Sequence, residues 1–156
     1  MSGKQKLSAS LEDYLETIYL LCRDHGEARS KDIMERLKVT GPSVTEALQL
    51  LSEKEMVNYV PYSPITMTKL GEEMARDVLH RHVTLRDFFI EVLGIDRETA
   101  DEGACKMEHA ASSGIIERMV QYTQFLREEC EEHGRIRGRC FTDYVKTIEE
   151  KRAQEE

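Results

Sequence analysis

Apolar residues recur every three or four positions near the start of the chain, which is the period of a helix with one buried face. The first such helix is predicted to have Ser10 as its N-cap and to stop at Gly26. Its apolar face carries Leu11, Leu15, Ile18 and Cys22. Because Cys22 shares this face, we expect it to be a core residue.

Two shorter helices follow with almost no chain between them. Ser30 is predicted to cap the first of them and Gly41 to break it, and the next helix opens at Pro42 or Ser43. The apolar positions of the pair are Ile33, Met34, Leu37, Val44, Leu48 and Leu51. Two short helices joined by a tight turn form a helix-turn-helix.

The pattern then changes from a helical period to strict alternation. Residues 57–61 and 65–67 alternate on either side of a turn at 62–64, which predicts a short hairpin. Pro61 restricts this hairpin to a sheet edge, where an exposed wing would lie. A helix, a helix-turn-helix and a hairpin, in that order, make a winged helix-turn-helix module over residues 8–70.

The remainder of the chain has helical periodicity. One long helix is predicted from Thr68 to Gly94, Asp96 caps a second, and a third begins at Ser112 or Ser113. The third has a broad apolar stripe, typical of a helical dimer interface, at Ile115, Ile116, Met119, Val120 and Phe125. The predicted fold is therefore mainly α. Its expected divisions are residues 1–72, 73–140 and, for a charged C-terminal helix, 141–156.

Potential metal ligands are concentrated in the helix after Asp96. In its segment CKMEH, Cys105, Glu108 and His109 are three and four residues apart, so on a helix they share an arc of roughly 100°. The spacing alone leaves two interpretations open. A lone cysteine is usually a small buried hydrophobe and a Glu-His pair is usually solvated, so metal binding needs further support.

Composition and charge narrow the class of protein. A net charge of −8 argues against indiscriminate binding of nucleic acid, but it allows a DNA reader with a small docking face. There is no run of about 18 apolar residues and no signal peptide, so we expect a cytoplasmic protein without a membrane partner. The motifs of metalloproteases, serine hydrolases and phosphate-binding loops are missing. We therefore expect no enzyme and no small-molecule substrate.

Several motifs resemble the diphtheria toxin repressor family of metal-dependent transcriptional regulators, and within it the two-domain manganese transport regulator-like branch. These motifs are EDYLETIYLL, VTGPSVTEALQLL at the recognition-helix position, the RH of LHRHVTLRDFF, and CKMEH. The resemblance runs over about residues 9 to 125. It implies an N-terminal winged helix-turn-helix followed by an all-helical metal-binding and dimerisation domain, a homodimer, and a palindromic double-stranded DNA operator.

The resemblance also implies a set of metal ligands. By position in the family motifs they are Asp13, Glu16, His82, Cys105, Glu108 and His109. The chain is a hybrid at two of them: the manganese branch has a carboxylate in place of Cys105, and the iron-responsive branch has a methionine in place of Asp13. Two ancillary-site positions of the iron branch hold other residues here, namely Arg86 and Asp101. A second ion would then use Glu16, His82 and either Asp101 or Glu102.

These ligand types set the expected cofactor. Carboxylate and imidazole suit Mn(II) and Fe(II), whereas a thiolate favours Fe(II), Zn(II) or other softer ions. The expected co-repressor is Fe(II) or Mn(II), and Zn(II) or Co(II) are expected to bind in vitro. The function that follows is a metal-dependent DNA-binding repressor of metal-ion homeostasis. The residues expected to touch DNA bases or phosphates are Arg29, Lys31, Pro42, Ser43, Thr45 and Gln49.

Two other functions stay open at the level of the sequence. One is a winged-helix regulator that senses oxidants through its thiols, Cys105, Cys130 and Cys140. The other is a metal-buffering or interaction module that does not bind DNA. The last two of these cysteines, together with His133, offer three candidate Zn(II) ligands, one fewer than a closed tetrahedral site needs.

Overall fold

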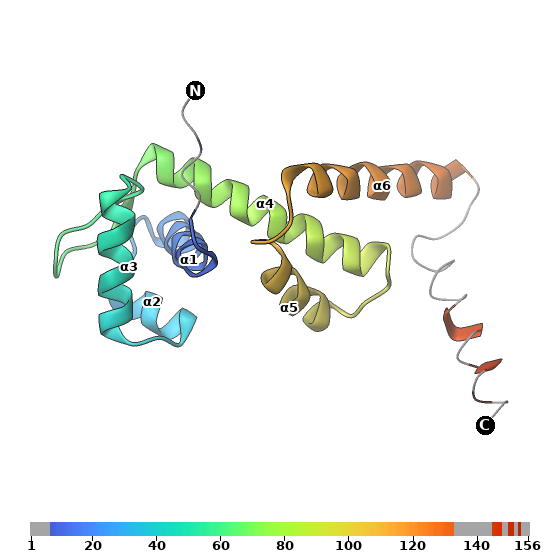
Figure 1. The fold of residues 1–156 in the computed structure, drawn as a ribbon, viewed down its shortest axis with the longest axis horizontal. Helices are drawn as coiled ribbons and strands as arrows, with labels where there is room; N and C mark the ends of the chain where they lie inside the picture. Colours follow the sequence, from blue (N-terminus) through green and yellow to red (C-terminus); the bar gives the residue numbers. More distant parts are fainter. Residues whose placement is uncertain (1–6, 133–144, 148–149, 152, 154–156) are drawn as a thin grey trace. The chain divides into compact units, whose positions relative to one another are not determined.

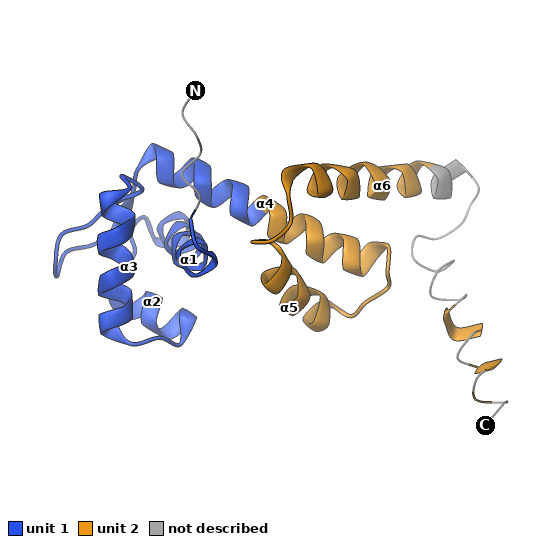
Figure 2. Cartoon of the chain, viewed as in Figure 1, with its two compact units in different colours: residues 1–79 blue, residues 80–156 orange. Residues whose placement is uncertain are grey.

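The computed structural model describes residues 7–132, 145–147, 150–151 and 153. In order, the elements are α1 (Ala9–His25), α2 (Ser30–Leu37), α3 (Gly41–Glu53), β1 (Val57–Asn58), β2 (Thr66–Met67), α4 (Lys69–Glu91), α5 (Arg97–Met107) and α6 (Ser113–Glu132) (Figure 1). The chain divides into two compact units, Met1–Leu79 and His80–Glu156 (Figure 2). The division falls within α4; the boundary expected near residue 72 stays a prediction.

In the first unit, α1 has the predicted end but not the predicted start. Ser8 is the N-cap, and its Oγ accepts from the amide of Leu11 at 3.3 Å. The prediction of Ser10 as the cap is therefore wrong: Ser10 lies inside the helix, and the serine two residues earlier accepts from the first turn. Gly26 ends the helix in the left-handed region (φ 82°), where its amide donates to the carbonyl of Cys22 at 2.7 Å.

The predicted helix-turn-helix is present, with residues 38–40 between its two helices. Ser30 is the first residue of α2 and makes no side-chain cap, so the predicted cap there is wrong. That helix ends at Leu37, with Lys38 in the left-handed region (φ 55°). Gly41 is the first residue of α3 and not the end of α2. Pro42 lies in the first turn of α3, where the missing amide hydrogen breaks no helical hydrogen bond.

The predicted hairpin is present but its ladder is short. Strands β1 and β2 are antiparallel, with Val57 opposite Met67 and Asn58 opposite Thr66. At the tip, the amide of Ser63 donates to the carbonyl of Val60 at 3.1 Å. Tyr62 has a φ of 65° there, in the region where a turn normally places glycine.

The core of the first unit joins the helices to the hairpin. Its fully buried side chains include Leu15, Ile18, Ile33, Leu48, Leu51, Met56 and Ile65. Cys22 packs against this core, and its Sγ donates to the carbonyl of Ile65 at 3.5 Å. Burial raises the pKa of the Cys22 thiol. Gly71 of α4 lies so close to Met56 that an added Cβ would come within 1.9 Å of the Met56 carbonyl oxygen.

The second unit is built from the rest of α4 with α5 and α6. Its buried centre consists of Leu85, Ala104 and Ile116, one from each helix, with Phe89 and Met119 packed around them. Asp96 caps α5 as predicted: its carboxylate accepts from the amide of Thr99 at 3.0 Å, which lowers the pKa of that carboxyl. The charged helix predicted at 141–156 lies largely outside the described residues. Within the part of the chain that the structure covers, no helix is long and apolar enough to cross a membrane.

Candidate metal centre

Glu108 is the centre of a polar cluster in the second unit. It is the C-cap of α5, with only 1% of its surface exposed. Its amide donates to the carbonyl of Ala104 at 2.9 Å, and its own carbonyl accepts from Nε of Arg81 at 2.9 Å. Because α5 ends at Met107, His109 lies in the following turn. Glu108 itself keeps helical backbone angles (φ −58°, ψ −33°), and the shared face of Cys105, Glu108 and His109 stays a prediction.

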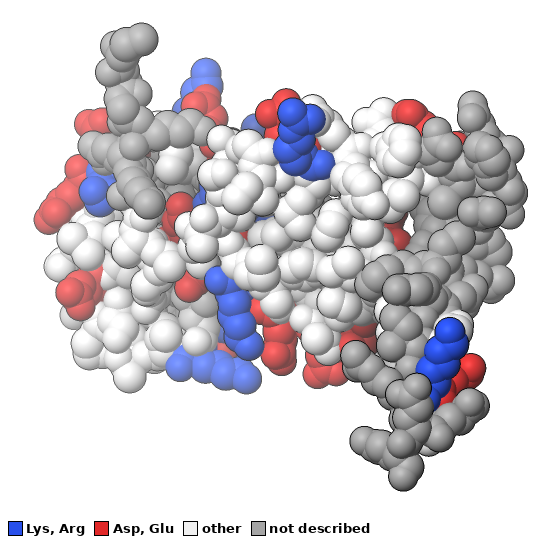
Figure 3. Space-filling view, turned by 45° about the vertical axis from the view of Figure 1, so that its right-hand side comes forward, with Lys and Arg blue, Asp and Glu red and all other residues white. Residues whose placement is uncertain are grey.

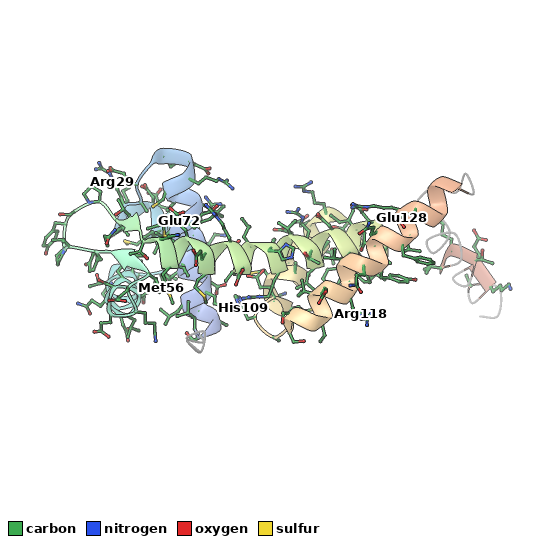
Figure 4. The ribbon with its side chains drawn as sticks, turned by 90° about the horizontal axis from the view of Figure 1, so that it is seen from above. Arg29, Met56, Glu72, His109, Arg118 and Glu128 are labelled. Atoms are coloured by element: carbon green, nitrogen blue, oxygen red, sulfur yellow. The ribbon has the colours of Figure 1, made fainter. Side chains whose placement is uncertain are left out.

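Two imidazoles face the carboxylate of Glu108, one on each oxygen. His82 of α4 places Nδ1 at 2.7 Å from Oε2, and His109 places Nε2 at 3.5 Å from Oε1. Both imidazole side chains are 14% exposed. His109 is labelled in Figure 4, where nitrogen atoms are blue. His80, two residues before His82, is exposed.

One oxygen of this carboxylate lacks a hydrogen bond. Oε1 of Glu108 is the one buried side-chain nitrogen or oxygen without a hydrogen-bond partner among the residues that the structure describes. Such an atom is costly to bury, because it has given up its water without gaining a donor. A divalent cation would satisfy it, and one carboxylate with two imidazoles is a donor set that Mn(II), Fe(II) and Zn(II) accept.

The remaining predicted ligands are Asp13, Glu16 and Cys105. Asp13 and Glu16 are half-buried on α1, in the first unit, and Cys105 is exposed in the last turn of α5. Their role as ligands stays a prediction. Of the two carboxylates expected to serve a second ion, Asp101 contacts Nε2 of His82 at 3.1 Å, whereas Glu102 is exposed and pairs with Lys106 at 3.7 Å.

The other ligand set considered from the sequence is not tested. The side chains of Cys130, His133 and Cys140 lie outside the described residues. Arg86, at one of the ancillary positions, donates to the neighbouring Asp87 at 2.9 Å.

The first unit has a hollow between the helix-turn-helix and the hairpin. Three of the predicted DNA-binding residues, Arg29, Thr45 and Gln49, line it together with residues of the hairpin. Pro42 and Ser43 are exposed in the first turn of α3. The inward face of α3 carries the buried Val44, Ala47, Leu48 and Leu51. The outward face of α3 is thus free of core packing.

Two tyrosines at this hollow were not among the predicted residues. Tyr59 and Tyr62 line it, and Tyr62 is fully exposed at the tip of the hairpin. The sequence offered little indication of this position. Alternation of apolar and polar residues placed both tyrosines in a hairpin, but it did not show that the hairpin lies beside α3. The cations here have acidic neighbours: Arg29 (labelled in Figure 4) pairs with Glu27 at 2.9 Å, and Lys31 is 3.7 Å from Glu35. On the face that Figure 3 shows, basic and acidic side chains are likewise interspersed.

The second unit also carries an apolar surface on α6. The predicted stripe divides in two: Ile116 is buried in the unit's core, whereas 55% of Ile115 and 52% of Phe125 is exposed. Tyr122 adds to the exposed part and stacks obliquely with Phe88 and with Phe125, at centroid distances of 6.4 and 6.3 Å. Exposed apolar faces are common at protein–protein interfaces, and the role of this face as the dimer interface stays a prediction.

Comparison with known proteins assigns a role to both units. The family model described as the N-terminal DNA binding domain of the iron dependent repressor matches residues 6–65, and the one described as its metal binding and dimerisation domain matches residues 68–137. An uncharacterised HTH-type transcriptional regulator of Methanocaldococcus jannaschii is 37% identical over 124 residues, which are 79% of this chain and 99% of the relative. The class of protein is therefore a metal-responsive, DNA-binding transcriptional regulator.

Further relatives place it in one family. The regulator MntR of Bacillus subtilis is 33% identical over 120 residues, 77% of this chain and 84% of the relative. IdeR of T. acidophilum has a similar structure, with a TM-score of 0.65 and 30% identity over 71% of this chain and 52% of that one. The structure of a manganese-dependent transcriptional repressor in complex with manganese is also similar, with a TM-score of 0.68 and 25% sequence identity. The match covers 74% of this chain and 53% of that one. This chain spans about half the length of those two solved structures. It belongs to the iron-dependent repressor family, which confirms the predicted resemblance and fold class.

Proposed function

We propose that the chain is a homodimeric repressor of metal-ion homeostasis genes that binds its operator when loaded with Fe(II) or Mn(II). The observation that carries the proposal is the buried Glu108, whose unsatisfied Oε1 faces His109 while Oε2 faces His82. A bound cation stabilises a buried carboxylate oxygen that has no hydrogen-bond donor. The manganese-dependent relatives support the choice of ion.

The ligands proposed for the ion fall into two groups by the kind of support they have. His82, Glu108 and His109 are supported by their distances in the second unit. Asp13, Glu16 and Cys105 are proposed on the family resemblance of the sequence alone. When bound, the ion supplies positive charge and directional coordination to these side chains. By linkage, any preference of the ion for the DNA-binding state of the protein strengthens operator binding by the same factor.

In this proposal α3 is the recognition helix. Its exposed first turn, with Pro42 and Ser43, and the side chains of Thr45 and Gln49 are available to base edges, because the buried face of α3 leaves them outside. Arg29 and Lys31 bind phosphates of the DNA backbone in place of the carboxylates of Glu27 and Glu35, with which they now pair. A homodimer formed through the apolar face of α6 reads a palindromic operator with half-sites about one helical turn apart or a multiple of it.

The proposed place of action is the cytoplasm, and the proposed action is binding and not catalysis. The alternatives weighed from the sequence gain no support from the relatives, which are described as transcriptional regulators. Cys22, which was not among the thiols proposed as sensors, is partly buried with a raised thiol pKa.

The test is DNA binding titrated with metal. A palindromic duplex is first selected from a random library by the protein loaded with Mn(II), and its affinity is then measured at fixed salt with Mn(II), with anaerobic Fe(II), with Zn(II) and with a chelator. We expect operator affinity to fall at least about tenfold in the chelator, the usual scale of coupling between two ligands. Equal affinity with and without metal overturns the proposal.

A further inference from the structure

The imidazole of His82 is held by a carboxylate at each of its two nitrogens. Nδ1 lies 2.7 Å from Oε2 of Glu108, and Nε2 lies 3.1 Å from Oδ1 of Asp101. The two carboxylates differ in exposure: the side chain of Glu108 is 1% exposed and that of Asp101 is 58% exposed. One side of the ring therefore faces the buried cluster and the other faces the protein surface.

The position of Asp101 follows from the helix it lies on. Asp101 and Glu108 are seven residues apart, which is close to two helical turns, so they lie on the same side of α5. The cap at Asp96 and the buried Ala100 and Ala104 fix that side of α5 within the second unit. His82, from α4, meets both carboxylates. The neighbouring Glu102 lies elsewhere on the helix and pairs with Lys106.

The surroundings of the two ring nitrogens differ. On the Nδ1 side lie the buried Glu108 and, beyond its other oxygen, His109. On the Nε2 side lies Asp101, whose side chain is mostly exposed. A nitrogen that coordinates a metal must offer its lone pair, so the ring proton then resides on the other nitrogen.

We infer that Asp101 is a positioning residue for the metal centre: it accepts the Nε2–H of His82 and so leaves the lone pair on Nδ1, the nitrogen beside Glu108, for the ion. The inference rests on the proposed function, because it takes His82 as a ligand. A carboxylate behind a ligating histidine fixes the orientation of the ring, selects its tautomer and raises the basicity of the ligating nitrogen. This positioning role is proposed in place of the role expected from the sequence, in which Asp101 would be a ligand of a second ion.

Metal affinity gives the first test. Mn(II) binding to the full chain is measured by the electron paramagnetic resonance of the free ion, and Zn(II) binding by competition with a chelating dye. Removing a partner behind a metal ligand costs about ten- to one-hundred-fold in affinity, and we expect a loss in that range for Asp101→Ala. Asp101→Asn is expected to lose less, since its amide oxygen still accepts from Nε2–H. Glu98→Ala, which removes the same charge from an exposed position in the first turn of α5, is the matched control.

A spectroscopic measurement separates positioning from a general loss of negative charge. In the Zn(II)-loaded wild type, the ¹⁵N spectrum of His82 is expected to show a proton on Nε2 in slow exchange and none on Nδ1. In Asp101→Ala the slow exchange of that proton is expected to be lost. A proton on Nδ1 in the wild type, or equal losses of affinity in Asp101→Ala and Glu98→Ala, overturns the inference.

The stoichiometry of binding distinguishes the remaining outcomes. If Asp101 were a ligand of a second ion, Asp101→Ala would bind fewer ions per chain, and the positioning role would be wrong. If the wild type and Asp101→Ala bind the same ions with the same affinity, the inference fails while the proposed function stands. If the wild type binds neither Mn(II) nor Zn(II), the proposed function fails and this inference fails with it.

Discussion

His82 and Glu108 are 26 residues apart in the chain, and their side chains meet at 2.7 Å, Nδ1 against Oε2. The contact joins α4 to the end of α5, and the same two helices contribute Leu85 and Ala104 to the buried core of the second unit. A polar pair retained next to such a core is costly unless it has a further partner. The buried Oε1 of Glu108 marks where that partner belongs.

The first prediction compares two histidines of α4. His82→Ala is expected to abolish the metal dependence of operator binding, because it removes the imidazole in contact with Glu108. His80→Ala is the control, since His80 is exposed and two residues away on another side of the helix. Fluorescence anisotropy of the labelled operator, titrated with Mn(II), measures both. Equal metal response in the two variants would show that His82 is not a ligand.

Replacing Glu108 tests whether the buried carboxylate binds an ion. Glu108→Gln keeps the shape of the side chain and an acceptor for His82, so the stability in chelator is expected to change by less than about 1 kcal/mol. Wild type at a metal concentration 100 times Kd gains about 2.7 kcal/mol from the ion, and the variant is expected to gain almost none. Thermal unfolding with and without Mn(II) measures both quantities. Glu98→Gln, at an exposed position of α5, is the control and is expected to retain the gain.

The sequence predicted the order of the helices and strands, because the period of the apolar residues and the positions of helix-breaking residues are local properties of the chain. It placed the ends less well: the cap at Ser8, the αL residue at Lys38 and the start of α3 at Gly41 depend on which of several suitable residues the chain uses. The end of α5 at Met107 was missed for the same reason.

Fewer features of the candidate site than of the fold could be predicted from the sequence. Spacing alone brought together Glu108 and His109, which are neighbours in the chain. The contact of His82 with Glu108 depends on how α4 packs on α5, and only the family resemblance indicated it. Asp101 was placed near His82 only as one of two alternative ligands of a second ion, and the direct contact between the two side chains was not predicted.

A glycine in the first unit gives a prediction about stability. Gly71→Ala is expected to destabilise the protein by about 3 kcal/mol or more, because its Cβ would meet the backbone carbonyl of Met56 and backbone cannot move aside as a side chain can. Gly114→Ala, in the first turn of α6 with nothing within 4 Å, is the control. That change is expected to be neutral or to stabilise by up to about 1 kcal/mol. Urea unfolding of both variants measures the difference, and a stable Gly71→Ala would contradict the close packing of α4 on Met56.

The last prediction concerns the choice of ion, which the hybrid ligand set makes testable. Cys105 is exposed in the last turn of α5, three residues before Glu108, so a thiolate there is available to an ion at the cluster. A thiolate ligand favours Fe(II) over Mn(II), because Mn(II) is hard and stands lowest in the affinity order of these divalent ions.

Cys105→Glu turns the proposed donor set into oxygen and nitrogen only. The variant is expected to keep or improve Mn(II)-dependent operator binding and to lose sensitivity to Fe(II) relative to wild type. Parallel anaerobic titrations give the two midpoints, and Cys105→Ser, which removes the thiolate without adding a carboxylate, separates loss of sulfur from gain of oxygen. An unchanged ratio of midpoints would mean that Cys105 does not set selectivity. A Co(II) spectrum of the wild type without a thiolate charge-transfer band would mean that it is not a ligand.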